Sequence, residues 1–252
     1  MRHSYQTAII TGASSGIGAE LARQIAPACK HLVLVARREE LMQDLAAEIS
    51  DCEVHVVVAD VTDSESYIEK LTEALKPLPT CDLAILNAGY GRFGKLTKPQ
   101  TANYLYTYGV NLFGAIATLD VVLPAMIEAN QGHIVGIASI AAYRGLPKAG
   151  PYASSKSAFW RALESMRCEL AQTDIRISTI HPGFIKTPMT ENNGRMPFLM
   201  DCEPAVKKIV TAIDKRKIHY AFPWQMRWLS YGVRLIPDGL YWRLFRRGKK
   251  KR

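Results

Sequence analysis

The chain has 252 residues, of which 48% are hydrophobic and 22% are charged. This length is enough for one large domain with a buried core, and this composition excludes a disordered or fibrous protein. The net charge is +9, but residues 227–252 hold nine Lys or Arg against one acid, which leaves +1 for the other 226 residues. A basic tail on a near-neutral body predicts an anionic partner for the tail alone.

Cysteine and histidine spacing indicates whether disulfides or metals are expected. The five cysteines are scattered without a C-x-x-C pair, and the six histidines show neither H-x-x-x-H nor H-E-x-x-H spacing. These patterns predict reduced thiols and no metal. A first strand near residue 7 leaves no room for a cleavable signal, and the apolar stretches fall short of the roughly 18 residues of a membrane span. We therefore expect a cytoplasmic protein that does not cross a bilayer.

Six apolar runs of strand length follow one another along the chain, at residues 7–11, 31–36, 54–58, 83–86, 133–138 and 175–180. Helical patterns lie between them: Leu41, Leu45 and Ile49 recur every fourth residue, a capping box from Thr62 to Glu65 precedes a helix over 67–75, and residues 101–129 form a long helix. Parallel neighbours need such crossovers. We expect one doubly wound α/β sheet over residues 1–222, with ligands at the carboxyl ends of its strands.

A glycine-rich turn follows the first strand directly, with Gly12, Gly16 and Gly18 ahead of a helical run over 19–26. Glycine lets the chain turn sharply, and a helix N-terminus offers free N–H groups and a favourable dipole to a phosphate. A tight connection that binds nothing would use the same glycines. The strand–turn–helix context favours a dinucleotide site.

Tyr152 and Lys156 form the single Y-x-x-x-K pair of the sequence, and Ser139 follows the fifth strand. Positions i and i+4 share one face of a helix, so the ammonium group would lie beside the phenol and lower its pKa. Such a tyrosine can transfer a proton, and a serine hydroxyl can bind the reacting oxygen. The alternatives are a surface Tyr–Lys pair and a serine that caps a turn.

Two arginines, Arg37 and Arg38, follow the second strand, where dinucleotide folds that prefer NAD place an acid against the ribose 2′-hydroxyl. The first acid after the strand is Glu39. Guanidinium groups match phosphate geometry, so this position predicts NADP(H). An exposed basic start of a helix is the alternative interpretation.

In this order, the motifs resemble those of the short-chain dehydrogenase/reductase family. The spacing T-G-x-x-x-G-x-G comes first, and the later matches extend to about residue 190: Asp60 in ADVTD, Asn87-Ala88-Gly89, Asn111 in VNLFG, Ser139, Tyr152 with Lys156, Pro182-Gly183 and Thr187. The sequence departs from the family pattern at Leu86, where the family often has a second Asn. Its basic C-terminal stretch is also longer than a minimal member needs.

The resemblance implies hydride transfer between NADP(H) and a carbonyl or alcohol carbon. It makes Tyr152 the general acid in reduction, Ser139 the group that polarises the carbonyl, and Lys156 the residue that tunes Tyr152 and binds the nicotinamide ribose. It gives Asn111 a proton-relay water to hold, although Asn111 could instead be a polar kink in its helix. The implied cofactor site comprises Gly12, Ser14, Ser15, Gly16, Ile17, Gly18, Arg37, Arg38, Asp60, Val61, Asn87, Ala88, Gly89, Tyr152, Lys156, Pro182, Gly183, Ile185 and Thr187.

The segment over about 184–202 covers the substrate in the family. Its large apolar residues include Met189, Met196, Phe198, Leu199 and Met200. Flexible apolar side chains predict an adaptable pocket for a hydrophobic small molecule, or ordinary packing of a lid.

Residues 223–252 form an aromatic and basic extension. Its aromatic and apolar residues at helical spacing are Trp224, Trp228, Tyr231, Leu235, Tyr241, Trp242, Leu244 and Phe245. This combination suits peripheral contact of residues 224–252 with an anionic membrane, at its inner face. The alternative is packing on the domain itself, or on the partner subunit of a homodimer or homotetramer. Nucleic-acid binding is not expected, because the body lacks a basic face.

Three functions agree with these features. The first is a reductase that acts on a lipophilic ketone or aldehyde at the membrane surface. The second is a catalytically silent dinucleotide-binding sensor, and the third is a soluble general carbonyl reductase whose tail closes an oligomer. The complete set of Asn111, Ser139, Tyr152 and Lys156 favours an enzyme, because a sensor needs no proton relay.

Overall fold

Parallel strands dominate the computed structural model, which describes residues 3–94, 100–191 and 194–246. Within these ranges one seven-stranded sheet has the order β3-β2-β1-β4-β5-β6-β7, and every pairing is parallel. The strands are β1 (Tyr5–Thr11), β2 (Cys29–Ala36), β3 (Glu53–Val58), β4 (Cys81–Leu86), β5 (Gly132–Ile137), β6 (Ile175–Pro182) and β7 (His219–Phe222).

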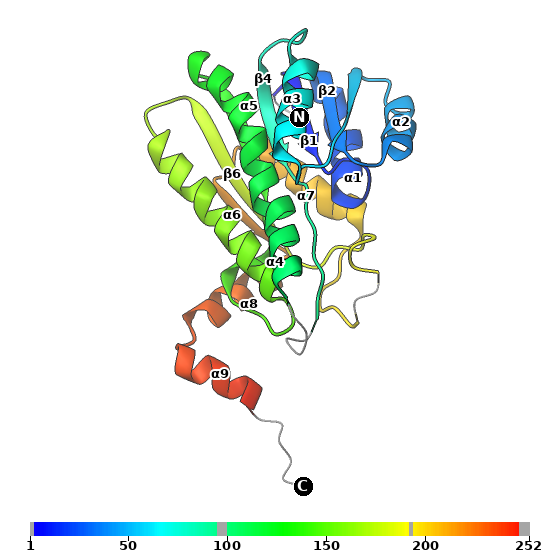
Figure 1. The fold of residues 1–252 in the computed structure, drawn as a ribbon. Helices are drawn as coiled ribbons and strands as arrows, with labels where there is room; N and C mark the ends of the chain where they lie inside the picture. Colours follow the sequence, from blue (N-terminus) through cyan, green and yellow to red (C-terminus); the bar gives the residue numbers. More distant parts are fainter. Residues whose placement is uncertain (1–2, 95–99, 192–193, 247–252) are drawn as a thin grey trace.

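Helices cover both faces of this sheet (Figure 1). They are α1 (Gly16–Ile25), η1 (Ala26–Ala28), α2 (Glu39–Glu48), α3 (Ser64–Leu75), α4 (Thr101–Tyr108), η2 (Gly109–Phe113), α5 (Gly114–Glu128), η3 (Ile140–Tyr143), α6 (Gly150–Glu169), α7 (Cys202–Asp214), α8 (Trp224–Leu235) and α9 (Asp238–Arg246). One apolar core lies between the sheet and α1, α2 and α7, and a second lies between the sheet and α3, α5 and α6. Burial on both faces explains why the central strands are almost continuously apolar.

The predicted doubly wound α/β sheet is confirmed, and all six expected strands are present. The seventh, β7, was not predicted, because it has four residues and its first two, His219 and Tyr220, are half-buried rather than core residues. The cap of α3 was assigned one residue too early. Asp63, not Thr62, caps the helix by accepting a hydrogen bond from the backbone N–H of Ser66.

The sequence predicted no apolar stretch long enough for a membrane span, and this prediction was wrong for the helix over Thr101–Glu128. By length and composition alone, this helix could cross a bilayer. In the fold it is a core helix. Leu119, Val122 and Met126 are buried in the apolar core beside the sheet. Polar residues interrupt the apolar stretches of this helix, but its average hydropathy is still that of a membrane-spanning helix.

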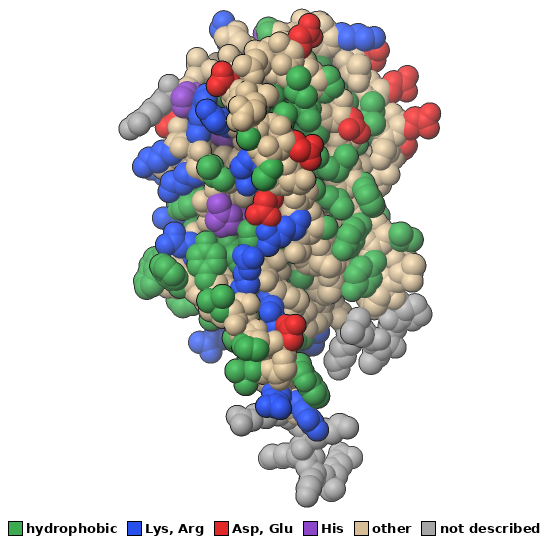
Figure 2. All heavy atoms as spheres, turned by 90° about the vertical axis from the view of Figure 1, so that its left-hand side faces the viewer, with side chains coloured by type: hydrophobic (Ala, Val, Ile, Leu, Met, Phe, Trp, Pro, Cys, Tyr) green, Lys and Arg blue, Asp and Glu red, His purple; other side chains and the backbone are tan. Residues whose placement is uncertain are grey.

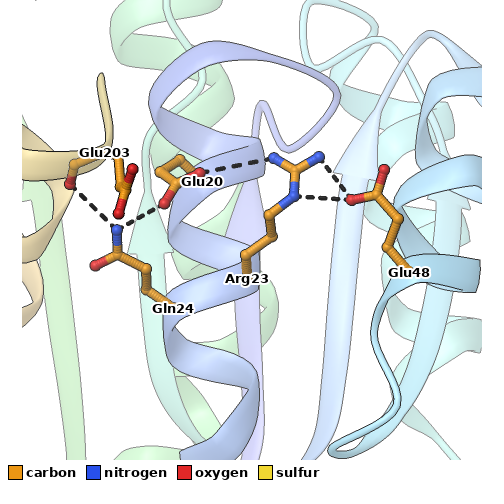
Figure 3. Close-up of polar contacts among 5 residues, drawn as sticks. All are labelled: Glu20, Arg23, Gln24, Glu48 and Glu203. Carbon is orange, nitrogen blue, oxygen red and sulfur yellow. Dashed lines mark hydrogen bonds and ion pairs between the residues drawn. The ribbon is translucent and has the colours of Figure 1, made fainter. Parts of the chain in front are cut away.

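Polar contacts join α1 to its two neighbouring helices (Figure 3). Arg23 pairs with Glu48 at the end of α2 through an N–O distance of 2.7 Å, and it also contacts Glu20 one turn earlier at 3.7 Å. On the other side, the Gln24 amide donates hydrogen bonds to Glu20 and to the backbone carbonyl of Glu203 in α7. These contacts fix the position of α1, the helix that follows the glycine turn, relative to α2 and α7.

The C-terminal helices differ in how they attach to the body. In α8, Met226 and Ser230 are buried, and the helix packs against η3 and β7. In α9 no residue is buried, and the helix projects away from the sheet (Figure 1). It is held at its start by Arg144, which donates to the Asp238 carboxylate at 2.6 Å, and by the Tyr241 hydroxyl, which donates to the Gly145 carbonyl.

Candidate active site

The glycine turn after β1 requires its glycines for two different reasons. Gly12 and Gly16 have φ values of +70° and +54°, in the left-handed region that favours glycine. Gly18 is needed for close approach, because a Cβ there would lie 2.1 Å from the Gly12 carbonyl oxygen. The turn therefore brings the start of α1 directly under the carboxyl end of β1.

Thr11 connects this turn to the end of β4. Its hydroxyl accepts hydrogen bonds from the backbone N–H groups of Asn87 and Ala88, each at 3.0 Å. The Asn87 amide in turn donates to the backbone carbonyls of Thr11 and Gly12. Because these bonds fix two adjacent strand ends, the Asn87-Ala88-Gly89 segment and the glycine turn form one rigid surface.

The two arginines after β2 have different partners. Arg38 donates to the hydroxyls of Ser14 at 2.9 Å and Ser15 at 2.6 Å, both in the glycine turn. Arg37 pairs with the Asp60 carboxylate at 3.2 Å and donates to the Tyr106 hydroxyl at 2.5 Å. The guanidinium of Arg38 therefore lies on the turn itself, and that of Arg37 lies beside the end of β3.

The Asp60 carboxylate is held by more than its arginine. One of its oxygens accepts hydrogen bonds from the backbone N–H and the hydroxyl of Thr62, at 2.9 and 2.8 Å. Partial burial works in the opposite direction, but the bonds from Thr62 and Arg37 keep the pKa of Asp60 below its ordinary value. The group is ionised at neutral pH and acts as a fixed acceptor.

Asn111 lies in a single π-helical turn, η2, that interrupts the long helix. Such turns occur often at functional sites. The side chain is buried, accepts a hydrogen bond from the Tyr90 N–H at 2.7 Å, and donates to the Tyr90 carbonyl and to the Ser155 hydroxyl at 2.9 and 2.8 Å. Asn111 is thus both a break in the helix and a clamp that joins the β4 loop to α6.

Three further predicted residues meet at the carboxyl end of β5. Tyr152 and Lys156 lie one turn apart on α6, and the Ser139 hydroxyl lies beside the Tyr152 phenol. The buried Lys156 ammonium donates to the Ile137 carbonyl at 2.8 Å. Ser139 also accepts from the Ala141 N–H at 3.1 Å as the cap of η3, so the turn-capping interpretation holds together with its place in the cavity wall.

The titration behaviour of this group differs from the expectation. Burial raises the pKa of Tyr152 above its ordinary value of 10.0, and the Ser139 hydroxyl opposes that shift only in part. Lys156 was expected to lower it, but the Lys156 ammonium is itself directed at the Ile137 carbonyl, and burial lowers the pKa of Lys156 to about 8. The phenol is therefore protonated at neutral pH, as a proton donor must be.

A ring cluster supports Ser139 from behind. The His181 Nδ1 lies 3.1 Å from the Ser139 carbonyl oxygen, and burial lowers the pKa of His181 to about 3. The imidazole is therefore neutral and can donate its Nδ1 proton to that carbonyl. Tyr143 and Trp160 pack against the imidazole ring, with centroids 5.2 and 4.6 Å away. This support was not predicted, because its members are far apart in the sequence and follow no motif.

Two adjoining cavities meet at Ser139 and Tyr152. The first, of about 370 Å³, is lined by the glycine turn, both arginines and the ends of β3, β4 and β6. Every predicted cofactor residue lines it, and so do three of the four predicted catalytic residues. Asn111 lies behind the wall instead. The lining residues that the sequence did not single out as cofactor-binding include Tyr90, Tyr106, Val110, Pro188, Met189 and Thr190.

The second cavity, of about 290 Å³, is mostly apolar and lies between η3, the segment after β6 and α8. Phe93, Phe184 and Met226 are among its walls, and Arg144 is its one cationic side chain in the described part of the chain. Of the apolar residues expected here, Met189 lines both cavities. Phe198 and Leu199 are exposed, and Met200 packs on the core and pairs with Ile185.

The first cavity fits an extended anionic molecule with a planar end group. Loop hydroxyls, backbone N–H groups at the start of α1 and two guanidinium groups lie at one end, while the buried Lys156 and the phenol lie at the other. A dinucleotide would extend between these ends. The second cavity would then bring a small apolar molecule to the same phenol.

Comparison with known proteins agrees with this geometry. A family model described as short chain dehydrogenase matches residues 6–197. The chain belongs to the short-chain dehydrogenase family. An uncharacterized oxidoreductase of Myxococcus xanthus is 34% identical over 241 residues, which cover 94% of this chain and 95% of that protein. This short-chain dehydrogenase is accordingly an oxidoreductase.

Solved structures share the fold. A short-chain dehydrogenase from Sphingobium yanoikuyae in complex with NADPH has a TM-score of 0.81 and 24% identity, with 98% of each chain covered. A short-chain dehydrogenase/reductase from Burkholderia phymatum in complex with NAD has a TM-score of 0.82 and 22% identity, covering 92% of this chain and 93% of that one. Both phosphorylated and unphosphorylated cofactors thus occur in proteins of this architecture.

Proposed function

We propose that this dehydrogenase transfers a hydride between NADP(H) and a lipophilic ketone, aldehyde or the corresponding alcohol. The observation that carries the proposal is the meeting of the two cavities at Ser139 and Tyr152. One cavity has anion-binding groups and the other is apolar, and the same phenol faces both. A bound nicotinamide would supply the hydride, and the protein would supply the proton.

The proposed roles follow from the environment of each group. The phenol of Tyr152 is protonated at neutral pH, so it can donate its proton to an oxygen that gains negative charge during reduction. The Ser139 hydroxyl, already fixed by its cap position, lies beside that phenol and would donate to the same oxygen. Lys156 would bind ribose hydroxyls and stabilise the phenolate left behind. Asn111 would position the loop at Tyr90, and the relay water assigned to it stays a prediction.

The preference for NADP(H) is proposed from the residues after β2. Arg38 and the hydroxyls of Ser14 and Ser15 form a small polar cluster of three donors at the glycine turn. A 2′-phosphate there would receive charge-assisted bonds from the guanidinium fork. Arg37 is already paired with Asp60, so we assign the larger share of phosphate recognition to Arg38 and a smaller share to Arg37.

The lipophilic substrate is proposed from the walls of the second cavity. Apolar and aromatic side chains dominate them, and a pocket of this kind recognises its ligand mainly by burial of apolar surface. Its outer wall is α8, which contributes Met226, Leu229, Ser230 and Val233 to the cavity. The helix that begins the C-terminal extension is therefore part of the substrate side.

We further propose that α8 and α9 dock on an anionic membrane from the cytoplasmic side. Opposite its cavity face, α8 exposes Trp224 and Trp228, and α9 exposes Trp242 and Phe245. Figure 2 shows hydrophobic and basic side chains interleaved over this part of the surface. Arg227 and Arg246 lie over Trp228 and Trp242, 5.2 Å from the ring centroids. Aromatic groups interleaved with cations suit the headgroup region. The basic residues 247–252 lie outside the described residues.

A homodimer or homotetramer is also proposed. The long helix exposes Leu105, Phe113 and Ile127, which are 69%, 56% and 49% accessible. Exposed large apolar residues on one core helix suit an interface between copies of the chain. Light scattering coupled to size exclusion would measure the assembly, and a monomer at micromolar concentration would contradict it.

The function is tested by supplying purified protein with NADPH and a panel of hydrophobic ketones and aldehydes of increasing chain length, and by supplying NADP with the matching alcohols. We expect cofactor consumption with at least one long-chain member and much less with NADH. The Tyr152→Phe variant serves as the inactive control. Cofactor binding without consumption on any panel member would favour the sensor. Consumption that is equal for short polar and long apolar carbonyls would favour a general carbonyl reductase.

A further inference from the structure

A group of metal-ligating side chains lies at the amino ends of β2 and β3, whereas the cavities lie at the carboxyl ends of the strands. His31 in β2 pairs in register with Glu53 in β3, and His55 follows two residues later on the same face of that strand. The sequence analysis predicted no metal, because these residues are separated along the chain. Parallel pairing brings them together, which a spacing search along one segment does not detect.

The ring nitrogens of the two histidines and the two carboxylate oxygens of Glu53 lie close together. The His31 Nδ1 lies 3.3 Å from the His55 Nε2 and 3.2 Å from a Glu53 carboxylate oxygen, and the His55 Nε2 lies 3.5 Å from the other oxygen of Glu53. Zinc binds imidazole nitrogen and carboxylate oxygen at about 2.0–2.1 Å in tetrahedral sites, and the corners of such a tetrahedron are about 3.3–3.4 Å apart. The distance between the two imidazole nitrogens, and that from His31 Nδ1 to one oxygen of Glu53, are therefore close to the edge length of a zinc tetrahedron.

Ordinary hydrogen bonds would account for the two imidazole–carboxylate contacts, one to each oxygen of Glu53, but they would leave two N–H donors facing each other at 3.3 Å. A single cation between the side chains would instead accept a lone pair from each imidazole nitrogen and from the carboxylate. Two imidazoles and one carboxylate also form a ligand set that zinc uses in proteins.

We propose that His31, Glu53 and His55 bind a zinc ion, or a divalent ion of similar ligand preference, at the edge of the sheet. The imidazole side chains are 22% and 24% accessible, whereas that of Glu53 is 64% accessible. The two histidines are therefore held by the strands, and the fourth position opens to solvent, where a water would complete the tetrahedron. No reaction is assigned to this ion.

The ion would act as a staple for the edge of the fold. Among the described strands, β3 is the outermost of the sheet, and β2 is its one neighbour. Beyond the carboxyl ends of β2 and β3, Arg37 and Asp60 form an ion pair that links the two strands. The ion would link the same two strands at their amino ends. An ion that binds the folded chain and not the unfolded one stabilises the fold by mass action.

The test uses the untagged full-length protein, treated with a chelator and then titrated with Zn²⁺ by calorimetry. We expect one site per chain and a rise in the thermal unfolding midpoint on addition of Zn²⁺. Co²⁺ should give visible absorption bands of a tetrahedral nitrogen and oxygen site, without the near-ultraviolet band of thiolate ligation, which would show that the cysteines are not the ligands.

The variants His31→Val and His55→Val keep β-branched residues at the strand positions, and each should abolish the Co²⁺ bands and the thermal rise. The matched control is His3→Gln, a histidine outside the group, which should keep both. Equal binding by the His31→Val, His55→Val and His3→Gln variants, or no binding by the wild-type chain, would overturn the proposal and leave a hydrogen-bonded group only. Far-ultraviolet dichroism of each variant shows that it is folded.

Discussion

The buried residues around the cavities and the surface residues of α8 and α9 differ in solvent accessibility and in their contacts. In and directly behind the cavity wall, Ser139, Lys156 and Asn111 are 8%, 3% and 1% accessible, and each side chain has a named hydrogen-bond partner. On α8 and α9, Trp228 and Trp242 are 60% and 55% accessible and lie beside the guanidinium groups of Arg227 and Arg246. The buried region fixes a geometry for chemistry, whereas the exposed region presents large apolar groups at the surface.

The contrast implies different responses to substitution. Each buried side chain of the site has a specific hydrogen-bond partner, so its substitution should have a large and specific effect on activity or stability. On the exposed surface, contributions are distributed over several side chains and depend on salt.

Replacing Tyr152 by Phe removes the phenolic oxygen and leaves the ring. We expect turnover to fall on the order of 10² to 10⁴, with cofactor affinity unchanged, because only the transferable proton is lost. Steady-state kinetics and cofactor titration by fluorescence measure the two effects. The matched control is Tyr220→Phe on β7, which should keep full turnover. A Tyr152→Phe enzyme with undiminished turnover would remove Tyr152 from its role.

The buried Lys156 should give the protein a recognisable pH dependence of stability. Its pKa falls from 10.5 to about 8 in the folded chain, so the unfolded chain binds more protons between these pH values. The free energy of unfolding should therefore rise with pH across this window, by about 3 kcal/mol from this group. The rise is obtained from urea titrations as the difference between the wild type and Lys156→Met. The exposed Lys207→Met variant is the control, and an equal difference for both would contradict the assignment.

Cofactor selectivity should depend on the arginines after β2. Loss of one charge-assisted phosphate contact costs roughly 1.5–3 kcal/mol, or about 10- to 150-fold in affinity. Arg38→Ala should weaken NADPH by this factor and leave NADH nearly unchanged, and Arg37→Ala should have a smaller effect of the same kind. Calorimetric titration with both nucleotides checks this. Equal losses for NADPH and NADH in both variants would show that neither arginine binds the 2′-phosphate.

Membrane docking should depend on the exposed tryptophans. The double substitution Trp228→Ser and Trp242→Ser should lower partitioning onto anionic phospholipid vesicles by about tenfold or more, because both rings lose apolar burial. Wild-type binding should weaken in high salt without vanishing, since the aromatic part is not screened. Co-sedimentation measures both. Leu41→Ser on α2, an exposed apolar residue away from α8 and α9, is the control and should bind as the wild type does. A wild-type protein that ignores anionic vesicles at low salt would refute docking.

The smallest effect is expected at the surface contacts of α1. Arg23 and Glu48 are 45% and 52% accessible at their side chains, and exposed ion pairs typically contribute about 0.2–1 kcal/mol. Arg23→Ala should therefore lower the free energy of unfolding by less than about 1 kcal/mol. Urea denaturation at low and high salt checks this value. A loss of several kcal/mol would mean that the contacts in Figure 3 matter more than their exposure indicates.

Motif order allowed most of the fold and the cofactor cavity to be predicted. The glycine turn and Asn87 are fixed by local geometry at strand ends, and Lys156 is fixed one turn after Tyr152 on α6, so spacing along the chain was informative. The sequence could not show that Arg37 pairs with Asp60 while Arg38 lies on Ser14, because both depend on side-chain direction. His181 was also missed. Its value comes from packing below Ser139, which has no sequence pattern.

The extension shows the same limit. Helical spacing of aromatic residues was visible, but it did not show that one face of α8 closes the second cavity through Met226 and Val233. The alternative of packing on the domain therefore holds for α8, and the projecting α9 has the exposed surface that the membrane interpretation needs. These interpretations are complementary, because a pocket wall that also reaches a lipid surface would admit a lipophilic substrate.

The central claim is hydride transfer from NADPH to a hydrophobic carbonyl with the Tyr152 proton. It is tested most directly by mass spectrometry of the products formed from NADPH deuterated at C4, with each face of the ring labelled in turn. With one labelled form, we expect one deuterium on the carbinol carbon of a long-chain product, and the Tyr152→Phe variant should form almost none of this labelled product. Products without deuterium from both labelled forms, or an equal yield of labelled product from the Tyr152→Phe variant, would contradict the claim.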